Sequence, residues 1–165
     1  MRRIRFPKAA HVAGPAVALI VVAGILVLPR QARALDGTRT TYLVKCGGCH
    51  GIEGLSGQTY IPVLRDRVGS LTCTSEGRSY LVRVPGVSMS LIRDDAVMAR
   101  VLNFVVFDLG GSSTPKGTRP YTAKEVHALR GHPLQTTDLP GLRAGVWGRA
   151  VAACAAQAGH AAGAY

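Results

Sequence analysis

The chain has 165 residues, which is enough for one ordinary domain with extensions. Its 20 Lys and Arg residues against nine Asp and Glu give a formal net charge of +11. Six of the basic residues and no acidic ones lie within residues 1–34, so residues 35–165 carry 14 minus 9, or +5. This modest surplus excludes any inference of a nucleic-acid-binding protein from the high pI alone. It predicts a mildly basic surface suited to an acidic partner.

Residues 1–34 have the pattern of an export signal. Basic residues stand at positions 2, 3, 5 and 8, and an apolar run follows from Ala16 to Leu28. This run is shorter than the roughly 20 residues that cross a bilayer. The small-x-small sequence at residues 32–34 then predicts signal cleavage after Ala34. We therefore expect unfolded export and a soluble periplasmic protein, with an uncleaved N-terminal membrane anchor as the alternative.

Three segments follow in the first half of the remaining chain. Residues 36–45 are expected to form a short helix with Tyr42 and Leu43 facing inward. Five glycines among residues 46–57 make a regular element unfavourable there. Residues 75–84 are expected to form a helix that stops at Pro85 and Gly86, although Tyr-Leu-Val-Arg-Val could also pass for a strand.

The clearest expected helix spans residues 94–108 and ends at the glycine pair 110–111. Asp94 and Asp95 suit the positive end of its dipole. Its apolar residues recur at helical spacing: Val97, Met98, Val101, Leu102, Phe104 and Val105.

Beyond this helix, residues 111–120 have the composition of a linker. Thr122 and Glu125 form a capping box that predicts a further short helix, which ends at Gly131. The last 22 residues contain ten alanines and could form a helix packed around Val151 or a loose tail. The expected class is all-α: a signal peptide (1–34), a small helical domain (35–110), a linker (111–120) and a C-terminal helical extension (121–165).

The motif with the most specific chemistry is Cys46-Gly47-Gly48-Cys49-His50, the sequence for covalent haem attachment. Two cysteines three positions apart can bond the two vinyl groups on one haem edge, and the histidine that follows becomes the proximal iron ligand. Two other sites share part of this pattern. A dithiol redox pair is expected in a βαβ setting, which is not apparent here. A zinc site needs a second Cys/His pair at short spacing, whereas Cys73 stands alone.

From residue 36 to residue 109 the chain resembles the class I monohaem c-type cytochromes. The resemblance lies in the order of helix, Cys-x-x-Cys-His, Pro-x-Leu, methionine loop and closing helix. It implies a cytochrome c-like fold around one haem c. It also implies that the Pro62 carbonyl accepts a hydrogen bond from His50 and that Leu64 packs on the porphyrin.

The sixth iron ligand is open between several residues. The resemblance favours Met89, which lies a few residues before the closing helix, and a thioether ligand raises the reduction potential. Met98 lies on the apolar stripe, where methionine is more often a core residue. The remaining alternatives are His127, His132, His160 or an open iron.

Cys73 and Cys154 also lie outside the haem motif. Export would expose them to an oxidising compartment, where a disulfide between them would pin the alanine-rich tail to the haem domain. Two unpaired or intermolecularly paired thiols are the alternative, because a sequence does not show distances.

Taken together, these features predict an electron carrier, not an enzyme, that passes single electrons from a dehydrogenase or quinol-oxidising complex to a terminal acceptor. Its redox partners would have an acidic docking face. One alternative is a haem subunit permanently bound to a dehydrogenase, and another is a haem sensor or enzyme with an open or labile sixth site. Candidates for a basic rim around the haem edge are Lys45, Arg65, Arg83 and Arg93.

Overall fold

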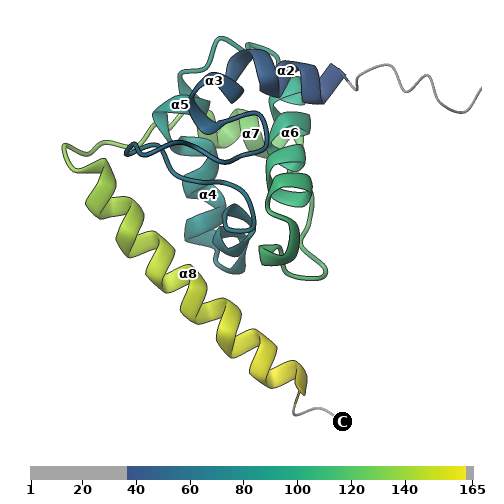
Figure 1. The fold of residues 1–165 in the computed structure, drawn as a ribbon, viewed down its shortest axis with the longest axis vertical. Coiled ribbons are helices and arrows are strands. Elements are labelled where there is room, and N and C mark those ends of the chain that lie inside the picture. The colour runs from purple at the N-terminus through teal and green to yellow at the C-terminus, as the bar shows by residue number, and fades with distance from the viewer. Residues whose placement is uncertain (1–36, 163–165) are drawn as a thin grey trace, which may run out of the picture. The chain divides into compact units, whose positions relative to one another are not determined.

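The computed structural model describes residues 37–162, with side chains up to residue 158. The predicted signal segment and its cleavage point lie outside these residues. Residues 37–162 contain helices and no strand, which confirms the predicted all-α class (Figure 1). None of these helices has both the length and the apolar character that a membrane span needs. The elements are α2 (Gly37–Lys45), α3 (Gly47–His50), η1 (Val68–Cys73), α4 (Ser75–Arg83), α5 (Pro85–Ser88), α6 (Asp95–Asn103), η2 (Phe104–Leu109), η3 (Gly111–Ser113), α7 (Ala123–Arg130) and α8 (Leu139–Ala162).

The first predicted helix is present as α2, and its Tyr42 side chain is fully buried. The centroids of the Tyr42 and Phe104 rings lie 5.3 Å apart, so α2 packs against the start of η2. The next segment differs from the prediction, because residues 47–50 form a helical turn despite their glycines. The Cys46 amide donates to the Tyr42 carbonyl over 2.8 Å and thereby carries the hydrogen bonding of α2 into α3.

The predicted helices at residues 75–84 and 94–108 are also present. Thr74 caps α4, and Pro85 both ends α4 and begins the short α5, since a proline suits the first turn of a helix. Asp94 Oδ1 accepts from the amides of Ala96 and Val97 over 2.7 and 3.1 Å and so caps α6. The helix continues as the π-helix η2 up to Leu109.

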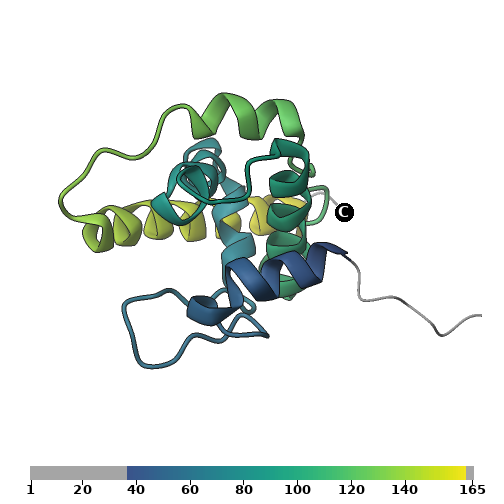
Figure 2. The same ribbon diagram turned by 90° about the horizontal axis from the view of Figure 1, so that it is seen from above.

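The C-terminal extension packs onto the rest of the unit. Helix α7 contacts α4 and α6, and α8 contacts η1 and α4 (Figures 1 and 2). The alanine-rich segment is helical, and the helix begins already at Leu139. Of the two alternatives that the sequence left open, a packed helix and a loose tail, the helix is present. Its inner face is formed by Val146 and Ala150, whereas Val151 is 40% exposed. The buried position lies one residue before Val151, which turns a side chain by about 100°.

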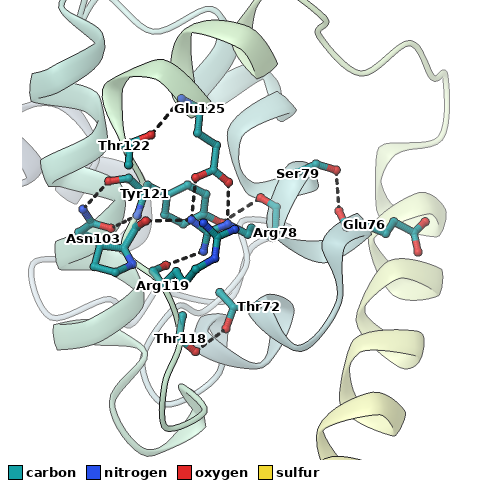
Figure 3. A network of polar contacts seen from close by, with 11 residues as sticks. Thr72, Glu76, Arg78, Ser79, Asn103, Thr118, Arg119, Tyr121, Thr122 and Glu125 are labelled. Atoms are coloured by element: carbon teal, nitrogen blue, oxygen red, sulfur yellow. Dashed lines mark hydrogen bonds and ion pairs between the residues drawn. The ribbon is translucent and has the colours of Figure 1, made fainter.

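Arg78 of α4 connects the linker and α7 to the core (Figure 3). Its guanidinium forms two hydrogen bonds with the Glu125 carboxylate, of 2.6 and 2.7 Å, and a third with the Arg119 carbonyl of 2.7 Å. It also lies 4.0 Å from the centre of the Tyr121 ring, whose hydroxyl donates to the Arg78 carbonyl. Glu125, which the sequence marked only as part of a capping box, thus also binds a neighbouring helix.

Candidate functional site

The short helix α3 brings two thiols and an imidazole together within one turn. Cys46 and His50 are half-buried and Cys49 is exposed. Both cysteines are free thiols, whereas Cys73 and Cys154 form a disulfide with their Cα atoms 5.3 Å apart. The tertiary structure therefore assigns the four cysteines to two different tasks and leaves the pair beside His50 available for chemistry.

The pKa of Cys46 is raised, first by burial and then by the negative charge of a neighbouring Cys49 thiolate. Dithiol redox centres depend on the opposite, a thiol whose pKa is lowered so that the thiolate can attack. Among residues 37–158 no three His, Cys, Asp or Glu side chains gather as ligands of a metal ion. Neither the dithiol nor the zinc interpretation of this motif gains support from the described geometry.

His50 is oriented by the carbonyl of Pro62. The His50 Nδ1 atom lies 3.1 Å from the Pro62 oxygen, which is the contact that the resemblance implies. In the tautomer that donates from Nδ1, the lone pair of Nε2 is free to bind a metal. Burial lowers the pKa of His50, the hydrogen bond to Pro62 opposes this, and the positive charge of Arg143 lowers it further. The imidazole is thus neutral at neutral pH, as a ligand must be.

A loop of irregular backbone returns from His50 to Pro62. Gly51 has a φ of +78°, and a Cβ there would collide with the backbone of Leu55. The Tyr42 hydroxyl donates to the Gly51 carbonyl over 2.8 Å, and the Leu64 amide donates to the Gly54 carbonyl over 2.8 Å. The Leu64 side chain is buried in the core. Sequence reasoning placed Tyr42 inside but missed that its hydroxyl holds this loop.

The two methionines among the described residues have opposite environments. Met89 ends α5, where its amide donates to the Pro85 carbonyl over 3.0 Å, and its side chain is 72% exposed. Met98 is 2% exposed and belongs to the hydrophobic core. Met98 is therefore a core residue, as expected, and Met89 is the methionine whose thioether is accessible.

The chain is 30% identical over 107 residues to cytochrome c-552 of Thermus thermophilus, an alignment that takes in 54% of this chain and 82% of the relative. The chain belongs to the c-type cytochromes. A second cytochrome c-552, from a strain of Thermus thermophilus, is also 30% identical over 107 residues, and the alignment covers 72% of that relative. No family model matches this c-type cytochrome, and no solved structure matches it significantly.

The other candidate ligands of this c-type cytochrome make different contacts. His127 Nδ1 lies 2.9 Å from Asp95 Oδ2, and its side chain is 83% exposed. His132 is exposed, and its carbonyl accepts from Arg83. The side chain of His160 lies outside the described residues.

Large apolar side chains are exposed on both segments that carry the expected ligands. Ile52, Leu55 and Tyr60 follow His50, and Leu91 follows Met89; each is more than half exposed. A group bound between these segments would remove part of this apolar surface from water. The donor set and these side chains together fit a porphyrin, because its ring would remove apolar surface from water.

The four candidates for a basic rim divide into two pairs. Arg65 forms an ion pair of 2.6 Å with Glu53, and Arg83 donates to the His132 carbonyl over 2.6 Å. Lys45 and Arg93 are exposed. Of the four candidates, Lys45 and Arg93 are therefore the two with exposed side chains.

Proposed function

We propose that this c-type cytochrome carries single electrons outside the cytoplasm through one covalently bound haem. The Cys46 and Cys49 thiols would each add across a vinyl double bond. A sulfur–carbon bond forms and the thiol proton goes to the adjacent carbon, so no oxidant is needed. His50 Nε2 would be the proximal ligand and the Met89 thioether the distal one. When bound, the haem iron supplies a one-electron redox couple.

The observation that carries this proposal is the pairing of two free thiols with a half-buried imidazole whose Nδ1 is already bonded to Pro62. That bond fixes the ring, selects its tautomer and strengthens Nε2 as a donor. If His50 and Met89 both held the haem iron, the iron could change oxidation state with little rearrangement, which would suit electron transfer better than catalysis.

Mass spectrometry of protein produced with the cytochrome c maturation machinery tests the attachment. The peptide that contains residues 46–50 should carry the added mass of one haem. Cys46→Ala/Cys49→Ala should lose this mass, and His50→Ala should prevent stable holoprotein, whereas His132→Ala should retain haem. A wild-type peptide without added mass would overturn the proposal.

The proposed location depends on residues 1–34, which lie outside the described residues. We propose export and cleavage after Ala34, so that the mature protein begins at Leu35. N-terminal sequencing of protein from the periplasm tests this. An intact N-terminus in the membrane fraction would favour the anchored form instead.

A second candidate function is a ligand-binding haem protein. It is favoured by the mostly local hydrogen bonds of the Met89 segment, because a weakly anchored thioether is easily displaced. Low-spin spectra that carbon monoxide and cyanide leave unchanged would support the carrier. Rapid binding of either ligand would support the labile site. A second chain that co-purifies at moderate salt would favour a permanent subunit of a dehydrogenase.

A further inference from the structure

The C-terminal extension contacts both segments that carry the proposed iron ligands, with one arginine for each. Arg143 of α8 is half-buried and donates from Nη2 to the Tyr60 carbonyl over 3.1 Å. Arg130 of α7 has a side chain that is 11% exposed and donates from Nη2 to the Ser90 carbonyl over 3.3 Å. Tyr60 lies two residues before Pro62, and Ser90 directly follows Met89.

The loop that presents Pro62 to His50 has few other connections. In the described part of the chain, two hydrogen bonds join residues 55–63 to anything outside them: His50 with Pro62, and Arg143 with Tyr60. The other hydrogen bonds of this loop are local, and residues 57–60 at its tip are exposed. Figures 1 and 2 both show the start of α8 beside the tip of this loop.

Arg130 links the Met89 segment to the closing helix. Its Nη1 donates to Asp95 Oδ1 over 2.9 Å while its Nη2 reaches the Ser90 carbonyl. Other contacts of the Met89 segment are backbone hydrogen bonds. Most of these are local, such as the bond from the Ser90 amide to the Val87 carbonyl.

Helix α8 is itself held firmly enough to act as a support. Cys154 is bonded to Cys73 of η1, and the side chains of Val146 and Ala150 are buried in the hydrophobic core. An arginine on such a helix presents its guanidinium from a defined position. The loop that Arg143 contacts therefore gains an anchor outside its own sequence.

We propose that Arg143 and Arg130 are positioning residues for the haem site. Arg143 holds the loop whose Pro62 carbonyl orients His50, and Arg130 holds the segment that presents Met89. This inference rests on the proposed function, since both arginines act through residues proposed to bind the iron. It assigns a task to the extension: it sets the geometry of the two axial ligands from the far end of the chain.

The test compares two variants with two matched controls, all as holoprotein. Arg143→Gln should raise the solvent-exchange rate of the His50 Nδ1 proton about fivefold, as expected for one lost hydrogen bond. Arg149→Gln, which removes the same charge from the same helix, should not. Arg130→Gln should raise the rate constant for cyanide binding to the ferric protein about fivefold. His127 contacts the same Asp95 carboxylate but not Ser90, so His127→Gln should leave this rate constant unchanged.

Arg143→Lys provides a rescue, because it retains a cationic donor and should restore slow exchange at His50. In the wild-type holoprotein, the guanidinium protons of Arg130 and Arg143 should exchange more slowly than those of the exposed Arg93, a measurement that needs no variant. Three outcomes would each overturn this inference but not the proposed function. The haem-loaded variants could keep the wild-type rates, or the control variants could change the rates equally. The guanidinium protons of Arg130 and Arg143 could also exchange as fast as those of Arg93. Absence of haem from the wild-type protein would overturn the proposed function as well.

Discussion

The two nitrogens of His50 have separate tasks, and the structure accounts for one of them. Nδ1 is occupied by the Pro62 carbonyl at 3.1 Å, so the ring has a defined orientation before any ligand binds. The motif alone identifies the histidine. The partner of its ring depends on how the glycine-containing loop folds back, which Gly51, Gly54 and Tyr42 together bring about.

The two methionines provide a direct test at the residue scale. Met89→Ala should keep the haem, lower the reduction potential and open the iron to carbon monoxide, because a thioether ligand raises the potential. Met98→Ala should leave the potential unchanged but reduce the free energy of unfolding by about 3 kcal/mol, since it empties a buried position. Redox titration and chemical denaturation of both variants distinguish the roles. An unchanged potential in Met89→Ala would exclude this methionine as a ligand.

At the scale of elements, the Cys73–Cys154 disulfide joins η1 to α8 across a sequence separation of 81. The double variant Cys73→Ser/Cys154→Ser should lose about 2–4 kcal/mol in the free energy of unfolding, because the unfolded chain regains the conformations that the bond forbids. Denaturation with and without dithiothreitol checks this. The reductant should destabilise the wild type only, and haem should stay attached because thioether bonds are not reduced.

The ion pair between Arg78 and Glu125 makes stability depend on pH. The hydrogen bond from Arg78 lowers the pKa of Glu125, against an opposing effect of burial. The stabilisation by this ion pair is therefore fully present above the usual pKa of a glutamate. It is lost as the pH falls through the lower pKa that Glu125 has in the folded state. Glu125→Gln should cost about 2 kcal/mol at pH 7 and less at an acidic pH below the lowered pKa of Glu125 in the folded state.

The control for this prediction is Glu76, whose partner Arg149 lies on α8. Both side chains of that pair are about half exposed, so solvent screens the interaction. Glu76→Gln should change the stability little at either pH. If Glu76→Gln and Glu125→Gln proved equally costly at pH 7, burial would not be the reason for the strength of the Arg78 pair.

At the scale of the whole molecule, the net charge of +5 on residues 35–165 should govern encounters with anions. The oxidation of the reduced protein by ferricyanide should slow as the ionic strength rises, because salt screens the attraction. Lys45→Gln/Arg93→Gln should weaken this salt dependence more than the control Lys116→Gln/Lys124→Gln, which removes the same two charges from exposed positions elsewhere. Stopped-flow rates at several salt concentrations decide this. Equal slopes for all variants would show that the proposed rim does not direct the encounter.

The sequence predicted the helices α2, α4, α6 and α7 well, because their signals are local. An N-terminal cap such as Thr122 or Asp94 and an apolar stripe such as that of α6 act within a few residues. The turn at α3 was missed, since the glycines there argue against a helix when considered alone. The preceding helix overrides them through the bond from Cys46 to Tyr42.

The sequence by itself determined the all-helical class and predicted the chemistry at residues 46–50, because both depend on spacings of a few residues. The tertiary structure alone decided that Cys73 pairs with Cys154, that Val146 and not Val151 faces inward, and that Arg130 and Arg143 reach the two ligand segments. The two arginine contacts join residues 40 and 83 positions apart. No local pattern encodes such a contact, because it forms only when separately folded segments pack against each other.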